Sequence, residues 1–304
     1  MEIASLIKKT KEFEDFCRLK DAGRFSHAYL IFSPDEIQNS VFCKLMAEKL
    51  ECSTMCGACG DCVKIEAGIH PDVLNYPKGK SFLVSDATDI IEQINVLPML
   101  ASYKIFVVHN FNTATTQAQN KLLKSLEEPP KNVIFLLNAT DLNPILQTII
   151  SRVQKIELKP LAKKDIESYL IEKDGTIDKN AIVEGNGWIG QTLKFNEDDN
   201  FKKDCAFVEN MMFSMKKSAD VIKFSPNFAS KENFALRLDI LENYFEKELN
   251  KIISGEQSEF TKEAVAEIFE RINLAKKQFA SNCNLNLISD TLLMGILEVK
   301  YLCG

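Results

Sequence analysis

NKLLKSLEEPPKNVIFLLNATDLNPILQTIISR, at residues 120–152, carries the clearest structural pattern in the chain. Its start continues an amphipathic helix predicted over 113–128, with Gln119 on the outer face. The apolar face of that helix comprises Ala118, Leu122, Leu123 and Leu126. Pro129-Pro130 ends the helix, because the residue before a proline is driven out of the helical region. VIFLLN at 133–138 then reads as a buried strand, and this order of helix and strand indicates an α/β fold.

The same alternation runs from residue 27 to residue 158 and predicts a mainly parallel sheet. The other strands are expected at HAYLIF (27–32), 73–76, IFVVH (105–109) and 155–158. Further helices are expected at 36–50, 85–96 and 144–151. This pattern defines a first α/β domain over residues 1–158.

Pro160 marks the end of that domain, and helical segments follow it. Residues 159–206 are expected to form a small helical lid. Residues 207–304 contain few strand-like segments and are expected to form an all-α C-terminal domain that serves packing or oligomerisation. Its helices are predicted at 207–218, 231–253, 261–279 and 285–301.

The segment between the first strand and its helix should hold a phosphate-binding loop, but it lacks the residues for one. Such a loop needs glycines that let backbone N–H groups converge on phosphate, and a lysine for the terminal phosphates. Residues 33–40 read SPDEIQNS, with no glycine and no lysine. Asp35 and Glu36 place negative charge near the helix start, where acidic side chains act as caps. We therefore interpret this segment as a helix cap.

The strand IFVVH ends without the acidic residues that hold Mg²⁺ in an active nucleotide hydrolase. His109 and Asn110 stand there instead. A single histidine at a strand end is more often a structural residue than a metal ligand. Both halves of a hydrolytic site are thus expected to be absent, and the isolated chain is predicted not to be an enzyme.

Composition limits the function classes further. The 304 residues are 45% hydrophobic and 26% charged, typical of a globular protein, and the formal net charge is −6. A negative chain is not expected to hold DNA alone, because such affinity comes largely from lysine and arginine. The N-terminus reads as an amphipathic helix and not as a signal peptide, so a cytoplasmic location is expected.

Four of the nine cysteines form a cluster typical of a structural metal site. Cys52, Cys56, Cys59 and Cys62 follow the pattern C-x3-C-x2-C-x2-C, with glycines between the sulfurs. Four closely spaced thiolates are the ligand set of structural zinc. Accidental clustering or a redox pair are the alternatives. The scattered cysteines are predicted to be small core residues: Cys17, Cys43, Cys205, Cys283 and Cys303.

Several motifs together resemble the bacterial clamp-loader family. They are HAYLIF before a helix, the cysteine cluster, EAGIHPD (66–72), NKLLKSLEEPP (120–130) and Ser151-Arg152. The order and spacing resemble most the delta-prime type, and next the ATP-hydrolysing gamma/tau type. The resemblance covers about the first half of the chain, and the defective phosphate loop favours the delta-prime type.

This resemblance implies an AAA+ ATPase-like domain with a zinc module at about 50–65, a lid and a C-terminal helical collar. In the family, five subunits form an open ring that loads the sliding clamp onto primed DNA within the DNA polymerase III holoenzyme. Implied partners are subunits of the gamma/tau and delta types, with the sliding clamp as a further candidate. No ATP is expected to bind productively.

The resemblance also implies a role for Arg152. Family members carry Ser-Arg-Cys, whose arginine contacts ATP on the neighbouring subunit; here the motif is Ser151-Arg152-Val153. A guanidinium is permanently charged and can bridge phosphoryl oxygens in the transition state. Arg152 is therefore expected to be an arginine finger acting in trans, with a surface ion pair as the alternative.

Other positions matched by the family are less well preserved. Asn138 and Thr140 stand where the family senses a γ-phosphate, and are interpreted as vestigial or structural. Residues 85–89, SDATD, correspond to a DNA-phosphate contact, but two aspartates oppose it. Glu127 and Glu128 end their helix either as solvated residues or as contacts for a neighbouring subunit.

Two other functions stay open at this level. One is a gamma/tau-like ATPase that binds nucleotide through an unusual loop. The other is a zinc-dependent nucleic-acid-binding module centred on the cysteine cluster, although Lys64 is its nearest basic residue.

Overall fold

The structure is a computed structural model that describes residues 2–174 and 179–302. The chain divides into two compact units, Met1–Asn196 and Glu197–Gly304. None of the helices in the described ranges combines the length and apolar character that a bilayer crossing requires.

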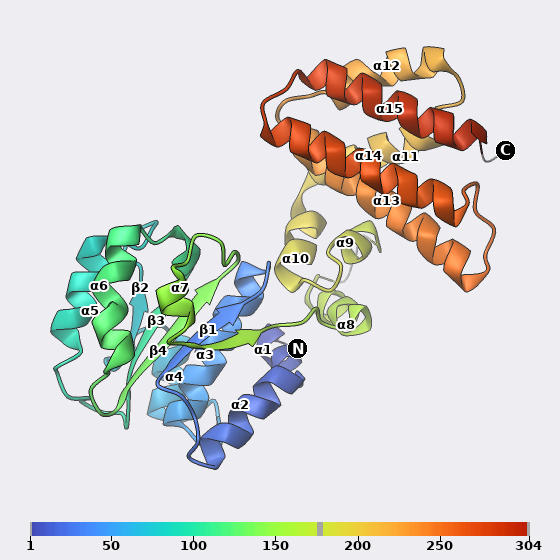
Figure 1. The fold of residues 1–304 in the computed structure, drawn as a ribbon. Helices are drawn as coiled ribbons and strands as arrows, with labels where there is room; N and C mark the ends of the chain where they lie inside the picture. Colours follow the sequence, from blue (N-terminus) through green and yellow to red (C-terminus); the bar gives the residue numbers. More distant parts are fainter. Residues whose placement is uncertain (1, 175–178, 303–304) are drawn as a thin grey trace. The chain divides into compact units, whose positions relative to one another are not determined.

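A parallel sheet forms the centre of the first unit (Figure 1). Within the described residues it has five strands in the order β2-β3-β4-β1-β5, and every neighbouring pair is parallel. The strands are β1 (Ala28–Phe32), β2 (Val73–Tyr76), β3 (Lys104–Val108), β4 (Val133–Ala139) and β5 (Gln154–Glu157). The expected α/β fold with a mainly parallel sheet is thus confirmed.

Side chains of the central strands alternate between two cores, because successive residues of a strand point to opposite faces. Ala28 and Leu30 of β1 lie in one buried cluster, with residues of α5 (Val84–Gln93), α6 (Thr116–Glu127) and α7 (Gln147–Ile150). Tyr29 and Ile31 lie in the other, with residues of α2 (Lys11–Asp21) and α3 (Glu36–Glu51). Both faces are therefore covered, which explains why these strands read as continuous apolar runs.

Helices surround this sheet. They are α1 (Ile3–Ile7), α2 (Lys11–Asp21), α3 (Glu36–Glu51), α4 (Gly60–Glu66), α5 (Val84–Gln93), the 3₁₀ helix η1 (Phe111–Thr113), α6 (Thr116–Glu127) and α7 (Gln147–Ile150). Three more follow the sheet: α8 (Lys163–Asp174), α9 (Lys179–Glu184) and α10 (Ile189–Glu197). Leu161, Ile166 and Leu170 from this region share a core with Leu6 of α1.

The second unit is helical throughout its described part. Its helices are α11 (Asp199–Ser214), α12 (Ser218–Phe228), α13 (Phe234–Ser254), α14 (Lys262–Ala280) and α15 (Leu285–Leu302). Aromatic side chains pack in its interior; the Phe234 ring, for example, lies 5.3 Å from that of Phe279. Arg237 pairs with the buried Asp204 at 2.6 Å.

Several predicted boundaries were wrong. The amphipathic N-terminus forms two helices, and Thr115, not a residue near 113, caps α6 by accepting the Ala118 N–H. The helix predicted over 207–218 instead runs from Asp199 to Ser214. Residues 159–206 as a separate lid domain and 207–304 as a collar stay predictions.

Two predictions about single side chains were also wrong. Gln119 is 1% exposed and not on an outer face, because its side chain bonds to backbone groups of neighbouring segments. Cys43 and Cys205 are buried as predicted, and the half-buried Cys17 packs against a buried core cluster, whereas Cys283 is exposed and was predicted wrongly. Cys303 lies outside the described residues.

Candidate functional site

The segment in the place of a phosphate loop begins directly after β1 and leads into α3. In parallel α/β sheets, ligands bind beyond the carboxyl ends of the strands. β1, β3 and β4 are consecutive or near neighbours in the sheet, so their ends bring Ser33, His109 and Asn138 to the same edge. Polar contacts at this edge therefore decide whether a nucleotide could enter.

Asn39 fills the interior of the loop. It is fully buried, and its Nδ2 donates to the Ser33 carbonyl at 2.9 Å and to the Ala139 carbonyl at 3.0 Å. Its Oδ1 accepts a hydrogen bond from the Ser33 hydroxyl at 2.7 Å. Asn39 thereby joins the loop to the end of β4 with its own side chain.

Asp35 occupies the start of α3. It is 2% exposed, and it accepts the Gln38 N–H at 2.9 Å, which confirms that it caps this helix. Its other oxygen accepts the Gly190 N–H, at the start of α10, at 2.6 Å. Loss of solvation raises the pKa of this carboxyl. Helix N-termini attract anions. Here the Asp35 carboxylate occupies the anion position at the N-termini of both α3 and α10.

His109 is a satisfied structural residue. Its Nδ1 lies 3.0 Å from both the Ser40 hydroxyl and the Asn138 amide nitrogen, and its Nε2 lies 3.2 Å from Asn75 Oδ1. Since the Asn138 amide donates to Nδ1, the ring proton is on Nε2. Burial lowers the pKa of His109, so the neutral ring is favoured.

Other polar residues at this edge of the sheet also form hydrogen bonds. Asn138 Oδ1 accepts the Asn110 N–H at 2.9 Å, and the Thr140 N–H donates to Asn112 Oδ1 at 3.1 Å. The Asn110 side chain donates to Glu36 at 2.5 Å. These contacts tie the strand ends to α3 and to η1.

Arg152 lies just beyond α7. Its Nη1 donates to the Thr148 carbonyl at 2.8 Å, and its Nη2 lies 3.2 Å from Glu127 Oε2. The Nε atom is buried and has no hydrogen-bond partner among the described residues. The Ser151 hydroxyl donates to the same Thr148 carbonyl at 3.1 Å. In the chain by itself, Arg152 therefore forms the ion pair that was the alternative to a finger, and one of its donors is unused.

The segment compared with a DNA contact, residues 85–89, lies in α5. Asp86 is buried and accepts the Leu83 N–H at 2.9 Å, so it caps the helix. Asp89 accepts a hydrogen bond from the Tyr76 hydroxyl at 2.5 Å. Both carboxylates thus serve the fold, and the first turn of α5 carries no basic side chain.

The four clustered cysteines converge and could hold a metal ion. The sulfur atoms of Cys52, Cys56, Cys59 and Cys62 all lie within 4.8 Å of one another. Cys52 Sγ and Cys56 Sγ are 3.8 Å apart, close to the spacing of about 3.8 Å expected for thiolates around a tetrahedral zinc ion. The donor set and its spacing therefore fit a tetrahedral metal site.

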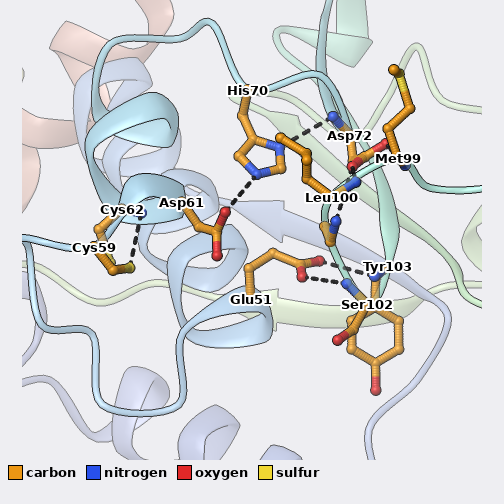
Figure 2. Close-up of polar contacts among 11 residues, drawn as sticks. Glu51, Cys59, Asp61, Cys62, His70, Asp72, Met99, Leu100, Ser102 and Tyr103 are labelled. Carbon is orange, nitrogen blue, oxygen red and sulfur yellow. Dashed lines mark hydrogen bonds and ion pairs between the residues drawn. The ribbon is translucent and has the colours of Figure 1, made fainter.

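Local hydrogen bonds favour the thiolate form, which metal binding requires, in two of the four cysteines, whereas loss of solvation raises the pKa of Cys62 to about 12. The Thr54 hydroxyl is the main contributor lowering the pKa of Cys52 to about 6. Backbone N–H groups lower the pKa of Cys56. The Cys62 N–H also donates to Cys59 Sγ at 3.4 Å, as Figure 2 shows.

Three acidic and basic residues near this cluster were given no role from the sequence, although two of them lie in the motif EAGIHPD at 66–72. His70 is buried, and its Nε2 lies 3.4 Å from Asp61 of α4 (Figure 2). Glu51 and Asp72 accept backbone hydrogen bonds from residues 99–103. The available signals were the position of Glu51 directly before a cysteine and the HPD triplet at 70–72.

Comparison with known proteins gives consistent relatives. Residues 8–162, just over half of the chain, match the family model described as "DNA polymerase III, delta subunit". The delta' subunit of DNA polymerase III from Bacillus subtilis is 33% identical over 159 residues, which cover 51% of this chain and 48% of that protein. The tau subunit from Escherichia coli is 31% identical over 153 residues, covering 49% of this chain and 24% of that protein.

A solved structure is also similar: a DNA polymerase III gamma subunit-related protein from Thermotoga maritima, with 17% identity and a TM-score of 0.42, covering 94% of this chain and 99% of that one. The alignments with the curated relatives span about a quarter to a half of those proteins' length. The family match, in contrast, includes the whole sheet and the cysteine cluster. The chain therefore belongs to the bacterial clamp-loader family described as DNA polymerase III, delta subunit.

Proposed function

We propose that this chain is a non-hydrolysing clamp-loader subunit of the delta-prime type, acting in the DNA polymerase III holoenzyme to help load the sliding clamp onto primed DNA. The observation that carries this proposal is the closed loop between β1 and α3. A working loop presents free backbone N–H groups to phosphate. Here the Gln38 N–H donates to the Asp35 carboxylate and the Asp35 N–H donates to the Ser33 hydroxyl. The Asn39 side chain fills the same loop by donating to the Ser33 and Ala139 carbonyls.

The chemistry of the loop, in addition to its shape, disfavours nucleotide binding. The Asp35 carboxylate and Glu36 bring negative charge to the start of α3. This charge would repel the negative charge of a triphosphate. Ser40, whose hydroxyl could otherwise bind Mg²⁺, is hydrogen-bonded to His109. We therefore expect no ATPase activity from the isolated chain, which contributes to the polymerase holoenzyme only by association.

Arg152 is proposed to act as an arginine finger for ATP bound by the neighbouring subunit. Its pair with Glu127 joins side chains that are 30% and 57% exposed. Such half-exposed pairs contribute about 1 kcal/mol or less, so the guanidinium can exchange Glu127 for a phosphoryl group. The unused Nε donor supports this, because an additional acceptor would satisfy it.

We propose zinc as the metal of the cysteine cluster, in a structural role. Residues Cys52, Cys56, Cys59 and Cys62 would supply all four ligands, so no coordination position stays open for catalysis. Bound zinc would hold the start of α4 against the end of α3, and it would stabilise this module.

The proposed partners are clamp-loader subunits of the gamma/tau and delta types in a cytoplasmic hetero-oligomer. The sliding clamp is a further candidate. Primed DNA would be engaged through the assembled ring, because residues 85–89 of α5 carry no basic side chain and two aspartates, one a helix cap and the other bonded to Tyr76.

The experiment that tests this proposal is ATP turnover by the ATP-binding clamp-loader subunits of the same organism, with clamp and primed DNA present. The native chain, Arg152→Ala and a matched surface variant, Arg18→Ala, are added in turn. We expect native and Arg18→Ala chains to stimulate turnover, and Arg152→Ala to assemble but to stimulate at least about tenfold less. Equal stimulation by all three would leave the chain as a scaffold only.

A binding measurement separates the proposal from a gamma/tau-like ATPase. Calorimetric titration of the isolated chain with ATP and Mg²⁺ should show no saturable binding. A tight, Mg²⁺-dependent complex would instead establish a nucleotide-binding subunit.

A further inference from the structure

An exposed apolar loop, residues 96–100, connects α5 to β3. Its sequence is VLPML, and the side chains of Leu97 and Met99 are 81% and 76% exposed. Val96 and Leu100 are more than half exposed. Apolar side chains at such exposure are not held in place by burial, so the backbone contacts of this loop determine its shape.

Two carboxylates fix that backbone. Five consecutive N–H groups, those of residues 99–103, donate to them. Asp72 accepts from Met99 and Leu100 at 2.8 Å and from Ala101 at 3.0 Å. Glu51 accepts from Ser102 at 2.9 Å and from Tyr103 at 3.1 Å. Figure 2 shows Glu51 facing Ser102 and Tyr103, and Asp72 beside Met99 and Leu100. Five hydrogen bonds of 2.8–3.1 Å therefore hold this run of backbone.

Both carboxylates are connected to the cysteine cluster. Glu51 is the last residue of α3 and directly precedes the ligand Cys52. The Asp72 N–H donates to His70 Nδ1 at 3.1 Å, which leaves the proton on Nε2 to face Asp61 Oδ1 at 3.4 Å. Asp61 lies in α4 between Cys59 and Cys62.

We propose that metal binding by the four cysteines orders residues 96–103, which comprise the exposed loop and the hydrogen-bonded run of backbone. Glu51 and the Asp61–His70–Asp72 chain are the connecting residues. The bound ion joins the end of α3 to the start of α4, and metal binding to such modules is coupled to their folding. Without the ion, the two helix ends that position Glu51 and Asp61 separate. The carboxylates then no longer lie within hydrogen-bond distance of residues 99–103.

The test is hydrogen–deuterium exchange of the full chain, read by mass spectrometry, with zinc bound and after zinc removal by a chelator. We expect amides of residues 99–103 to exchange at least about tenfold faster without zinc, while amides of β4 keep their protection and exclude global unfolding. Unchanged exchange at 99–103 beside a loosened cysteine cluster would overturn the coupling.

Zinc content, measured in the same samples, separates this inference from the zinc site on which it rests. A chain that binds no zinc overturns both. A chain with one zinc ion whose loop does not respond to zinc removal overturns the coupling alone.

A single substitution tests the connecting residue directly. Glu51→Gln should accelerate exchange at residues 102 and 103 severalfold while zinc content stays at one ion per chain, because the amide offers one acceptor oxygen where the two oxygens of Glu51 each accept an N–H. Glu66→Gln is the matched control: Glu66 ends α4, pairs with Lys44 at 2.6 Å, and is not among the residues that contact loop 99–103. Equal exchange in native and Glu51→Gln chains, or an equal effect of the two variants, would overturn the role of Glu51.

Discussion

The Asn39 side chain makes structural hydrogen bonds inside the segment that stands in the place of a phosphate-binding loop. Its amide donates to the Ser33 carbonyl and to the Ala139 carbonyl, of which the latter also accepts the Ser33 N–H at 3.4 Å. Leaving buried acceptors unpaired costs about 1–3 kcal/mol. We therefore expect Asn39→Ala to lower the free energy of unfolding by about 1–3 kcal/mol, measured by urea denaturation.

The matched control is Asn95→Ala, at an exposed position near the end of α5. It should change the free energy of unfolding by less than about 0.5 kcal/mol. Equal effects of the two substitutions would show that Asn39 does not hold the loop.

His109 predicts a pH dependence of stability. Its folded pKa is lowered by burial, so as the pH falls the unfolded chain takes up the proton first. The stabilisation is complete above the unfolded pKa of about 6.5 and is lost as the pH falls through the folded value. The free energy of unfolding should therefore fall less steeply between pH 7 and pH 5 in His109→Gln than in the native chain, as followed by denaturation at several pH values. An identical pH dependence of the free energy of unfolding in the two chains would contradict a lowered pKa of His109 in the folded state.

Substitution of Glu127 tests whether its ion pair restrains Arg152, the proposed arginine finger. Because its pair with Arg152 is largely exposed, Glu127→Gln should change the free energy of unfolding by less than about 1 kcal/mol. In the turnover assay it should stimulate at least as well as the native chain, since it frees the guanidinium. The neighbouring Glu128→Gln serves as control. Loss of stimulation in Glu127→Gln alone would mean that Glu127 itself takes part in the subunit contact.

At the scale of elements, the contact between α3 and α10 depends on Gly190. A Cβ at this position would lie 2.5 Å from Asp35 Oδ1 and 3.2 Å from the Ile37 Cβ. Gly190→Ala should therefore displace α10 from α3, with a loss of about 1–3 kcal/mol in urea denaturation and faster proteolysis near residues 186–190.

Gly79→Ala is the matched control for that substitution, because a Cβ there meets nothing within 4 Å. It should leave both readouts unchanged. A Gly190→Ala chain as stable and as resistant to protease as the control would rule out close packing at this contact.

Among the elements, strands were easier to predict than helix ends. β2 was predicted at 73–76 and is found there, since buried apolar runs are bounded by turn residues on both sides. The helix α12 was missed, because Pro226 inside it reads as a helix break. α6 starts later than its periodicity suggests, because the Thr115 cap and not the apolar spacing sets its first residue.

At the scale of the whole molecule, the two compact units offer a test of the metal site. Trp188 is the only tryptophan and belongs to the unit Met1–Asn196, so its fluorescence reports that unit, whereas helical circular dichroism reports both. A ligand that binds only the folded state raises stability. Zinc removal should thus lower the unfolding midpoint seen by tryptophan fluorescence and leave a transition for residues 197–304 unchanged. A chelator that shifts neither transition would exclude a stabilising metal.

The sequence by itself determined the strand pattern, the absence of a phosphate-binding lysine and glycines, and the cysteine spacing, because these features are periodic or local along the chain. Tertiary structure alone decided how the site is closed and connected. Asp35 meets Gly190 across 155 positions, and Glu51 meets Ser102 across 51. Gln119, polar on a helix, became buried for the same reason: its partners come from another segment. Hydrogen bonds require atoms to lie within about 3 Å, and no spacing along the chain encodes which distant backbone groups packing will bring that close.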